Sequence, residues 1–210
     1  MTMQVLQDKI QINKAREELN KKGASHLDRP DTRMKSLLRR LGLVKDVVMG
    51  DMIKSWDVLA TVKFIESDVM KSEPILDIGC YSSEVLASLH KVGYSNLTGA
   101  DLNPHLNRMP YQESIRYEVT NFMQTKFADS SFKAITSISV IEHDFNGQAL
   151  LKEMSRLLQS GGYFIASFDY WPEKIDTTGT QFFGMDWEIF SKEQVANFVT
   201  EAATYGLFPL

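Results

Sequence analysis

Short apolar runs alternate with helical segments through the second part of the chain, and this alternation constrains the fold more than any other feature. Five runs have the length of buried strands, at residues 74–79, 96–101, 114–119, 132–141 and 162–168. Segments with helical spacing lie between them, most clearly at residues 83–93 and 146–161. Strands that alternate with helices predict an α/β fold, with a Rossmann-like, doubly wound and mostly parallel sheet that has helices on both faces.

The segment at 146–161 illustrates how the helix boundaries are predicted. Asn146 suits an N-cap, and Gly161 suits the position after the last helical turn. Leu150, Met154, Leu157 and Leu158 would form one apolar face between them. The pattern therefore predicts a helix that continues as far as Gly161.

The first 72 residues have a different pattern, which indicates helices without intervening strands. Residues 3–23 predict a polar helix, residues 34–43 a short helix and residues 50–71 a longer one. The longest has an apolar stripe made of Ile53, Trp56, Leu59, Val62 and Ile65. We therefore expect an N-terminal helical extension at 1–72, which covers the body or contacts a partner or second copy, and a Rossmann-like domain at 73–210.

Composition excludes several classes of protein. The 210 residues have a formal net charge of −4, so no general basic field favours nucleic acid, and the cluster Arg33, Lys35, Arg39 and Arg40 is interpreted as a solvated helix face. A single cysteine excludes an intrachain disulfide and a CxxC metal site, and we expect no metal. No apolar run reaches the ~20 residues of a membrane span, and no signal-peptide pattern is present. We expect a cytoplasmic protein that binds neither membrane nor nucleic acid.

A candidate ligand site follows from the predicted parallel sheet, because ligands of such sheets bind beyond the carboxyl ends of the strands. Residues 79–83 form the turn after the first predicted strand, and a helix that begins at Ser82 or Ser83 would direct free N–H groups at an anion. Asp101 ends the next predicted strand, about 20 residues later, where a carboxylate commonly accepts hydrogen bonds from ribose hydroxyls. A nucleoside with an anionic group fits both features.

Other interpretations of these residues stay open. Ser82 could serve only as a helix N-cap, and Asp101 could only cap the turn at residues 103–105. A nicotinamide dinucleotide is a further alternative, although the turn "GCYSSE" lacks the second and third glycines that admit a pyrophosphate.

Four motifs, in order and with matching spacing, resemble the class I S-adenosylmethionine-dependent methyltransferases, in the small-molecule branch with the pattern LDIGCGxG. "ILDIGCYSS" resembles the first motif and "LTGADLNP" the second, while "NFMQTKFADSSFKAITSISVIEH" and "LLKEMSRLLQSGGYFIAS" are similar to the later two. The resemblance covers about residues 74–206. It implies the strand order 3-2-1-4-5, S-adenosylmethionine as cofactor and S-adenosylhomocysteine as product.

The resemblance also implies which residues surround each part of the cofactor. The methionyl part would be surrounded by Asp77, Gly79, Cys80, Tyr81 and Ser82. The nucleoside would contact Asp101 at the ribose and Leu102 and the Asn121 amide oxygen at the adenine, and Phe122 would add a contact through its backbone. Ser139 and Val140 would lie near the sulfonium.

The acceptor side has two candidate catalytic residues. His143 and Asp169 could act as general base, which is needed only for a poorly acidic hydroxyl or a protonated amine. The alternatives are a structural role at a helix entrance for His143 and capping for Asp169. Tyr170 and Trp171 could form an aromatic wall for a sugar or planar acceptor, or pack under a loop. The long connection at 177–191 is where we expect substrate specificity.

Departures from the family pattern leave two hypotheses about function. Tyr81 and Ser83 replace glycines, Lys133 replaces an aspartate, and the antiparallel sixth and seventh strands of the family are expected to be missing. The first hypothesis is methyl transfer to oxygen or nitrogen of a small-molecule or glycan-like acceptor. The second is an inactive, methyltransferase-like binding module whose N-terminal helices contact a partner.

Overall fold

A five-stranded parallel sheet forms the centre of the computed structural model, which describes residues 3–27, 47–143, 146–182 and 184–210. The strand order is β3-β2-β1-β4-β5, which confirms the predicted α/β fold and strand order. The strands are β1 (Ile75–Ile78), β2 (Leu97–Asp101), β3 (Ile115–Val119), β4 (Phe132–Ile138) and β5 (Leu158–Ser167).

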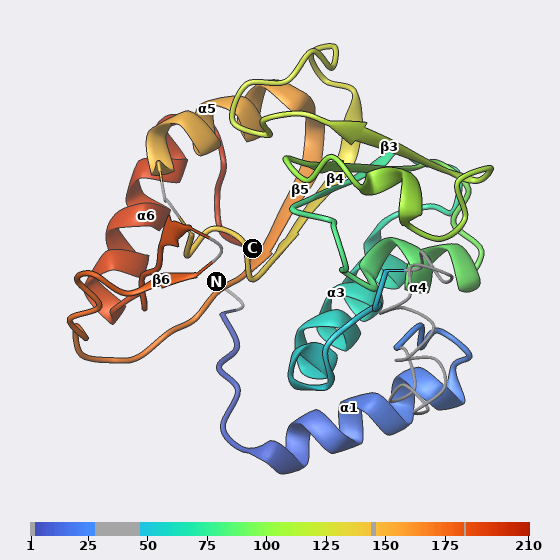
Figure 1. Ribbon diagram of the computed structural model, residues 1–210. Helices are drawn as coiled ribbons and strands as arrows, with labels where there is room; N and C mark the ends of the chain where they lie inside the picture. Colours follow the sequence, from blue (N-terminus) through green and yellow to red (C-terminus); the bar gives the residue numbers. More distant parts are fainter. Residues whose placement is uncertain (1–2, 28–46, 144–145, 183) are drawn as a thin grey trace.

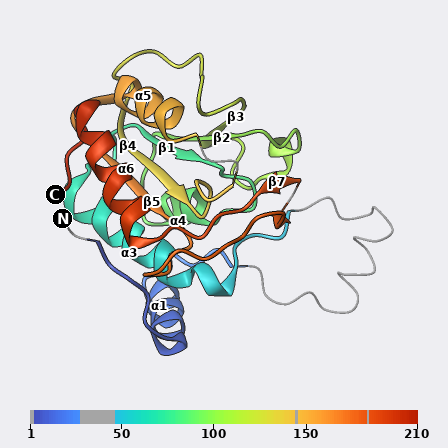
Figure 2. The same ribbon diagram turned by 90° about the vertical axis from the view of Figure 1, so that its left-hand side faces the viewer.

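Helices cover both faces of this sheet (Figures 1 and 2). One face carries α3 (Ser55–Asp68) and α4 (Val85–Lys91), with α1 (Lys9–Lys21) packed on α3. The other face carries α5 (Gly147–Leu157) and α6 (Lys192–Thr204). Short elements are the 3-10 turns η1 (Met52–Lys54) and η2 (Leu106–Arg108) and the hairpin strands β6 (Gln181–Phe182) and β7 (Met185–Asp186).

The side chains of β1 explain why it lies in the middle of the sheet. All four residues are buried, and alternate apolar side chains enter different cores. Ile75 packs with α3 and α4, whereas Leu76 and Ile78 pack with α5 on the opposite face. Apart from the buried Asp77, the strand is apolar throughout, as a parallel strand covered on both faces requires.

Two predicted boundaries near the site are wrong, and both errors have a local cause. Helix α5 ends at Leu157 because Leu158 has an extended backbone (φ −73°, ψ 137°) and pairs with Phe132 in the sheet. Gly161 therefore lies inside β5 and does not end the helix. Strand β4 ends at Ile138 and not at residue 141, because Ser139 takes a left-handed conformation (φ 52°) that a strand cannot contain.

The N-terminal helices differ from their prediction in detail. Asp8 caps α1 by accepting a hydrogen bond from the Gln11 amide, so the helix begins later than residue 3. Ile53 belongs to η1 and is exposed, and Val58 takes a place in the buried face of α3 instead. The predicted helix at 34–43 and the basic cluster at 33–40 lie outside the described residues.

The outer edge of β5 and the N-terminal boundary bear on two further expectations. Among the described residues no antiparallel strand extends the sheet beyond β5, and β6 and β7 pair only with each other. The apolar core shared by α1, α3, α4 and β1 crosses the proposed boundary at residue 73, and the division into 1–72 and 73–210 stays a prediction. None of the described helices is both long and apolar enough to span a membrane.

Candidate active site

The predicted cofactor residues gather where β1, β2, β3 and β4 end. Gly79 begins the loop that leads from β1 to α4, and Asp101 is the last residue of β2. Asn121 follows β3 and Ser139 follows β4. The carboxyl ends of parallel neighbouring strands meet at one edge of the sheet, so residues far apart in the sequence surround one site.

The unusual backbone conformations of the loop 79–83 do not fall at the positions where other residues replace glycines. Gly79 and Ser82 both have a φ of 67°, whereas neither Tyr81 nor Ser83, which replace glycines, has a positive φ. A Cβ on Gly79 would lie 2.3 Å from Cγ2 of Val140, so only glycine allows Val140 to pack there. The two absent glycines are thus not needed for the backbone path, and Ser82 carries a strain of about 1–2 kcal/mol.

Asp101 connects this loop to the end of β2. Its Oδ2 accepts a hydrogen bond from the Tyr81 amide at 2.9 Å, and its Oδ1 accepts one from the Asn103 amide at 2.8 Å. Asp101 therefore does cap the turn at 103, as the alternative interpretation held, and also fixes the loop. Each carboxylate oxygen has a second lone pair, and the side chain is half-buried, so ribose hydroxyls could still bind it.

Asp77 lies beneath the loop as a buried carboxyl. Its Oδ1 accepts a hydrogen bond from the Thr136 hydroxyl at 2.6 Å, whereas Oδ2 has no hydrogen bond of normal geometry among the described residues. Burial raises the pKa of Asp77 to about 7, and the hydroxyls of Thr136 and Ser83 oppose the shift. Burial also raises the pKa of the neighbouring Cys80 thiol, so this cysteine is not a reactive nucleophile.

The nucleoside side of the site has an open apolar surface. Leu102 is 58 % exposed although it directly follows a buried strand. The Asn121 side chain is exposed and its Oδ1 accepts a hydrogen bond from the Met123 amide at 2.9 Å. Phe122 packs into the apolar core of the α5 and α6 face. The structure therefore leaves Leu102 and the Asn121 amide open to a planar base, and the backbone contact expected of Phe122 stays a prediction.

These groups fit S-adenosylmethionine in chemistry. Within the described part of the chain, the Ser82 amide donates only to the Met109 thioether at 3.4 Å, a weak acceptor that a carboxylate would displace. The Asp101 carboxylate suits ribose hydroxyls, and the exposed Leu102 suits an adenine face. The described residues contain no group of three His, Cys, Asp or Glu side chains placed to hold a metal ion.

On the acceptor side, Asp169 follows β5 and joins η1 to the hairpin. Its Oδ1 lies 3.6 Å from Nζ of Lys54, and its Oδ2 accepts a hydrogen bond from Nε1 of Trp187 at 3.1 Å. His143 pairs with Trp187 through a backbone bridge, and its ring centroid lies 6.3 Å from that of Phe182. His143 and Asp169, the two predicted candidates for acceptor chemistry, thus lie in one cluster with Lys54 and Trp187.

The titration of this cluster differs between its members. Desolvation lowers the pKa of His143, with Asp169 opposing, so the imidazole is neutral near pH 7. Glu142 is buried, and burial followed by the nearby Asp169 charge raises its pKa to about 7. Its Oε2 has no hydrogen-bond partner among the described residues. Glu142 is therefore a third candidate base.

Sequence reasoning missed three members of the cluster. Lys54 and Trp187 come from a turn and from the long connection, and no spacing in the sequence relates them to Asp169. Glu142 stands in the quoted "IEH" motif, which was the available signal.

The two aromatic residues after Asp169 do not form one wall. Tyr170 packs into the core of the α5 and α6 face and forms a bridge with Phe190, whereas Trp171 is largely exposed. Successive residues of an extended chain point in opposite directions, which explains the difference. Tyr170 matches the packing interpretation, and only Trp171 remains as a candidate acceptor contact.

Comparison with known proteins agrees with this geometry. Residues 76–166 match the model of a methyltransferase domain family. A sterol 24-C-methyltransferase of Aspergillus fumigatus is 29% identical over 98 residues, which span 43% of this chain but only 26% of that protein.

Two solved structures share the fold. An S-adenosylmethionine-dependent methyltransferase from Mesorhizobium loti superposes with a TM-score of 0.55 at 17% identity, over 69% of this chain and 79% of its own. The [4+2]-cyclase SpnF superposes with a TM-score of 0.56 at 13% identity, over 80% and 67% of the two chains.

The strand order and the site at its carboxyl edge define the class I methyltransferase fold. Together with the family match over residues 76–166, they relate this chain to the S-adenosylmethionine-dependent methyltransferases in fold and, over that segment, in sequence.

Proposed function

We propose that the protein binds S-adenosylmethionine and transfers its methyl group to oxygen or nitrogen of a small-molecule acceptor. The observation that supports this most directly is the Asp101 carboxylate, which is tied to the loop 79–83 on one side and lies beside the exposed Leu102 on the other. That arrangement offers hydrogen-bond acceptors for a ribose, an apolar surface for a base and the backbone N–H of Ser82 for a carboxylate.

S-adenosylmethionine supplies an activated methyl group whose leaving thioether needs no protonation. The protein therefore has to align the acceptor and exclude water. The loop 79–83, packed on Val140, would form one wall of the cofactor site. His143, Glu142 and Asp169 are placed to accept a proton from an acceptor hydroxyl or ammonium. Lys54 and Trp187 hold the Asp169 carboxylate in one orientation.

A second candidate function is a methyltransferase-like module that does not transfer methyl groups. The cyclase SpnF, which shares the fold, supports this candidate, because it is a [4+2]-cyclase and not a methyltransferase. In this alternative the N-terminal helices would contact a partner or a second copy, with exposed apolar residues such as Ile10 on α1.

Calorimetric titration with S-adenosylhomocysteine, run beside NAD, tests the proposal. Wild-type protein should bind the former and not the latter, and Asp101→Ala should weaken binding about tenfold or more because a charge-assisted hydrogen bond is worth about 1.5–3 kcal/mol. Asp68→Ala, at the exposed end of α3, is the matched control and should bind like wild type. Absence of binding to wild type would refute the proposal.

A further inference from the structure

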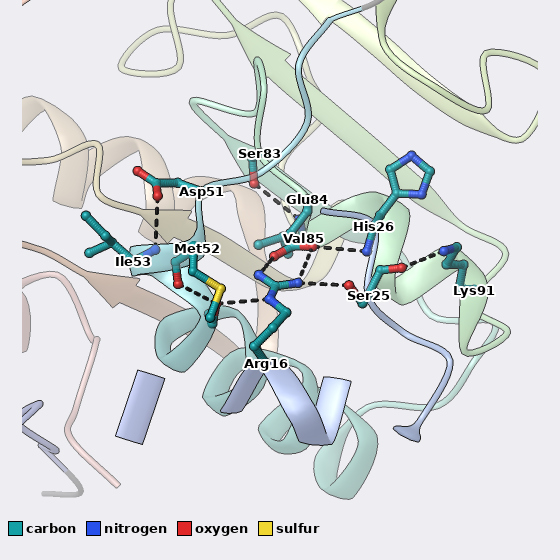
Figure 3. A network of polar contacts seen from close by, with 11 residues as sticks. Arg16, Ser25, His26, Asp51, Met52, Ile53, Ser83, Glu84, Val85 and Lys91 are labelled. Carbon is teal, nitrogen blue, oxygen red and sulfur yellow. Dashed lines mark hydrogen bonds and ion pairs between the residues drawn. The ribbon is translucent and has the colours of Figure 1, made fainter. Parts of the chain in front are cut away.

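A buried ion pair joins the N-terminal helix to the residue that follows the candidate cofactor loop (Figure 3). Arg16 on α1 is 6% exposed and Glu84 is 1% exposed. The contact is bidentate: Nη1 of Arg16 lies 3.0 Å from Oε2 of Glu84, and Nη2 donates to Oε1. Glu84 stands directly before α4 and two residues after Ser82, so the pair acts where the loop ends.

The remaining hydrogen bonds of the pair extend it to two other segments. Arg16 donates from Nε to the Ser55 hydroxyl at 3.0 Å and from Nη1 to the Ser25 hydroxyl at 2.9 Å. The His26 amide donates to Oε2 of Glu84 at 3.0 Å. One guanidinium and one carboxylate therefore connect α1, the segment after α1, the start of α3 and the end of the loop (Figure 3).

The segment before η1 holds the loop from the same side. The Gly50 amide donates to the Ser82 carbonyl at 2.8 Å, and the Ser82 hydroxyl donates to the Val48 carbonyl. A Cβ on Gly50 would lie 3.2 Å from Cδ of Glu84, so this segment passes directly over the ion pair. The strained Ser82 is thus fixed by contacts with the N-terminal residues.

These contacts offer a physical reason why the loop functions with few glycines. Its left-handed Ser82 would relax if nothing outside the loop held it. A buried ion pair is not needed for stability as such, because replacing a whole pair by apolar residues is often neutral. A bidentate pair does, however, fix the orientation of its two side chains relative to each other. We propose that Arg16 is a positioning residue of the cofactor site, acting through Glu84 to hold loop 79–83 in its cofactor-binding conformation. This inference rests on the proposed function.

Titration with S-adenosylhomocysteine, combined with amide hydrogen exchange of residues 80–84 in the free protein, tests the inference. The variants are Arg16→Met, Glu84→Gln and the double variant. The control is Lys63→Met, which removes an ion pair between α3 and Glu18 of α1 that does not contact the loop. Arg16→Met should weaken binding about tenfold and accelerate exchange in the loop, while Lys63→Met should stay within about twofold of wild type.

The double variant shows whether Arg16 acts through Glu84. If it does, the double variant binds no more than about twofold worse than the weaker single variant, because residues of one network do not add. Two independent, fully additive losses would overturn the inference. A folded Arg16→Met variant with wild-type affinity and wild-type exchange would overturn it as well.

Two further results separate the inference from the proposed function. If wild type gives no heat with S-adenosylhomocysteine, the proposed function fails and the inference fails with it; if wild type binds and Arg16→Met binds equally, only the inference fails. Should Arg16→Met not fold, Arg16→Lys replaces it, because lysine cannot reproduce the bidentate contact. A loss of about threefold or more is expected there, and a folded Arg16→Lys variant with unchanged affinity overturns the inference.

Discussion

Gly79→Ala is the substitution whose cost the structure defines best. The new methyl group would lie 2.3 Å from Cγ2 and 2.8 Å from Cγ1 of Val140, and the residue would have to keep a φ of 67°. A left-handed conformation costs a residue with a Cβ about 1–2 kcal/mol. Overpacking against a neighbour costs a further 1–3 kcal/mol or so. The variant should therefore lose about 2–5 kcal/mol of unfolding free energy.

Gly23→Ala is a matched control for the backbone contribution. Gly23 has a φ of 69°, and a Cβ there would meet no atom within 4 Å. Its substitution should cost only the conformational part, about 1–2 kcal/mol. The difference between the two variants measures the contact between position 79 and Val140.

Urea unfolding measures both losses. With a slope of about 2 kcal/mol per molar urea, Gly79→Ala should lower the midpoint by about 1 M or more, and Gly23→Ala by less than about 1 M. S-adenosylhomocysteine binding should fall in Gly79→Ala and stay at the wild-type level in Gly23→Ala. Equal midpoint losses in the two variants would refute the argument that Val140 packs on Gly79.

Three other predictions follow from the site. The pKa of Asp77 is raised to about 7 in the folded state, so the free energy of unfolding should decline as pH rises from about 4 to 7. Asp77→Asn should flatten this pH dependence in urea titrations at several pH values, and an unchanged pH dependence would contradict the raised pKa of Asp77. Tyr81→Gly should lose about 1–2 kcal/mol of stability and bind S-adenosylhomocysteine more weakly, because the half-buried ring packs into the core; higher affinity would instead identify Tyr81 as an obstruction. Asp169→Asn should bind S-adenosylhomocysteine normally and lower methyl transfer by about a hundredfold if Asp169 acts in proton transfer, as single-turnover assays would show; unchanged turnover would exclude that role.

Much of the fold could be predicted because it depends on local pattern. The mainly apolar run at Ile75–Ile78 is buried on both faces, and the family resemblance carried by the motifs implied the strand order that the structure has. The boundary errors arose where tertiary pairing overrode local signals. Leu158 continues the apolar spacing of α5 but pairs with Phe132, and Ser139 interrupts β4 with a backbone angle that serine rarely adopts.

The site could be predicted only where its residues follow strands. Asp101 and Gly79 stand at strand ends, and both were predicted as site residues. The small number of glycines in the loop was also visible in the sequence, but the left-handed conformation of Ser82 was not. The contacts that hold the loop join Arg16 to Glu84, and no periodicity relates residues so distant in the sequence. The same is true of Lys54 and Asp169, which meet only because η1 lies over the end of β5.

A crystal structure of the protein grown with S-adenosylhomocysteine is the most direct test of the account. It should show the ligand between loop 79–83 and the end of β2, with the ribose hydroxyls on the Asp101 carboxylate and Leu102 covered by the adenine. A ligand bound at another place would contradict the assignment of this site. So would a site that stays empty at ligand concentrations well above those used in the calorimetric titrations.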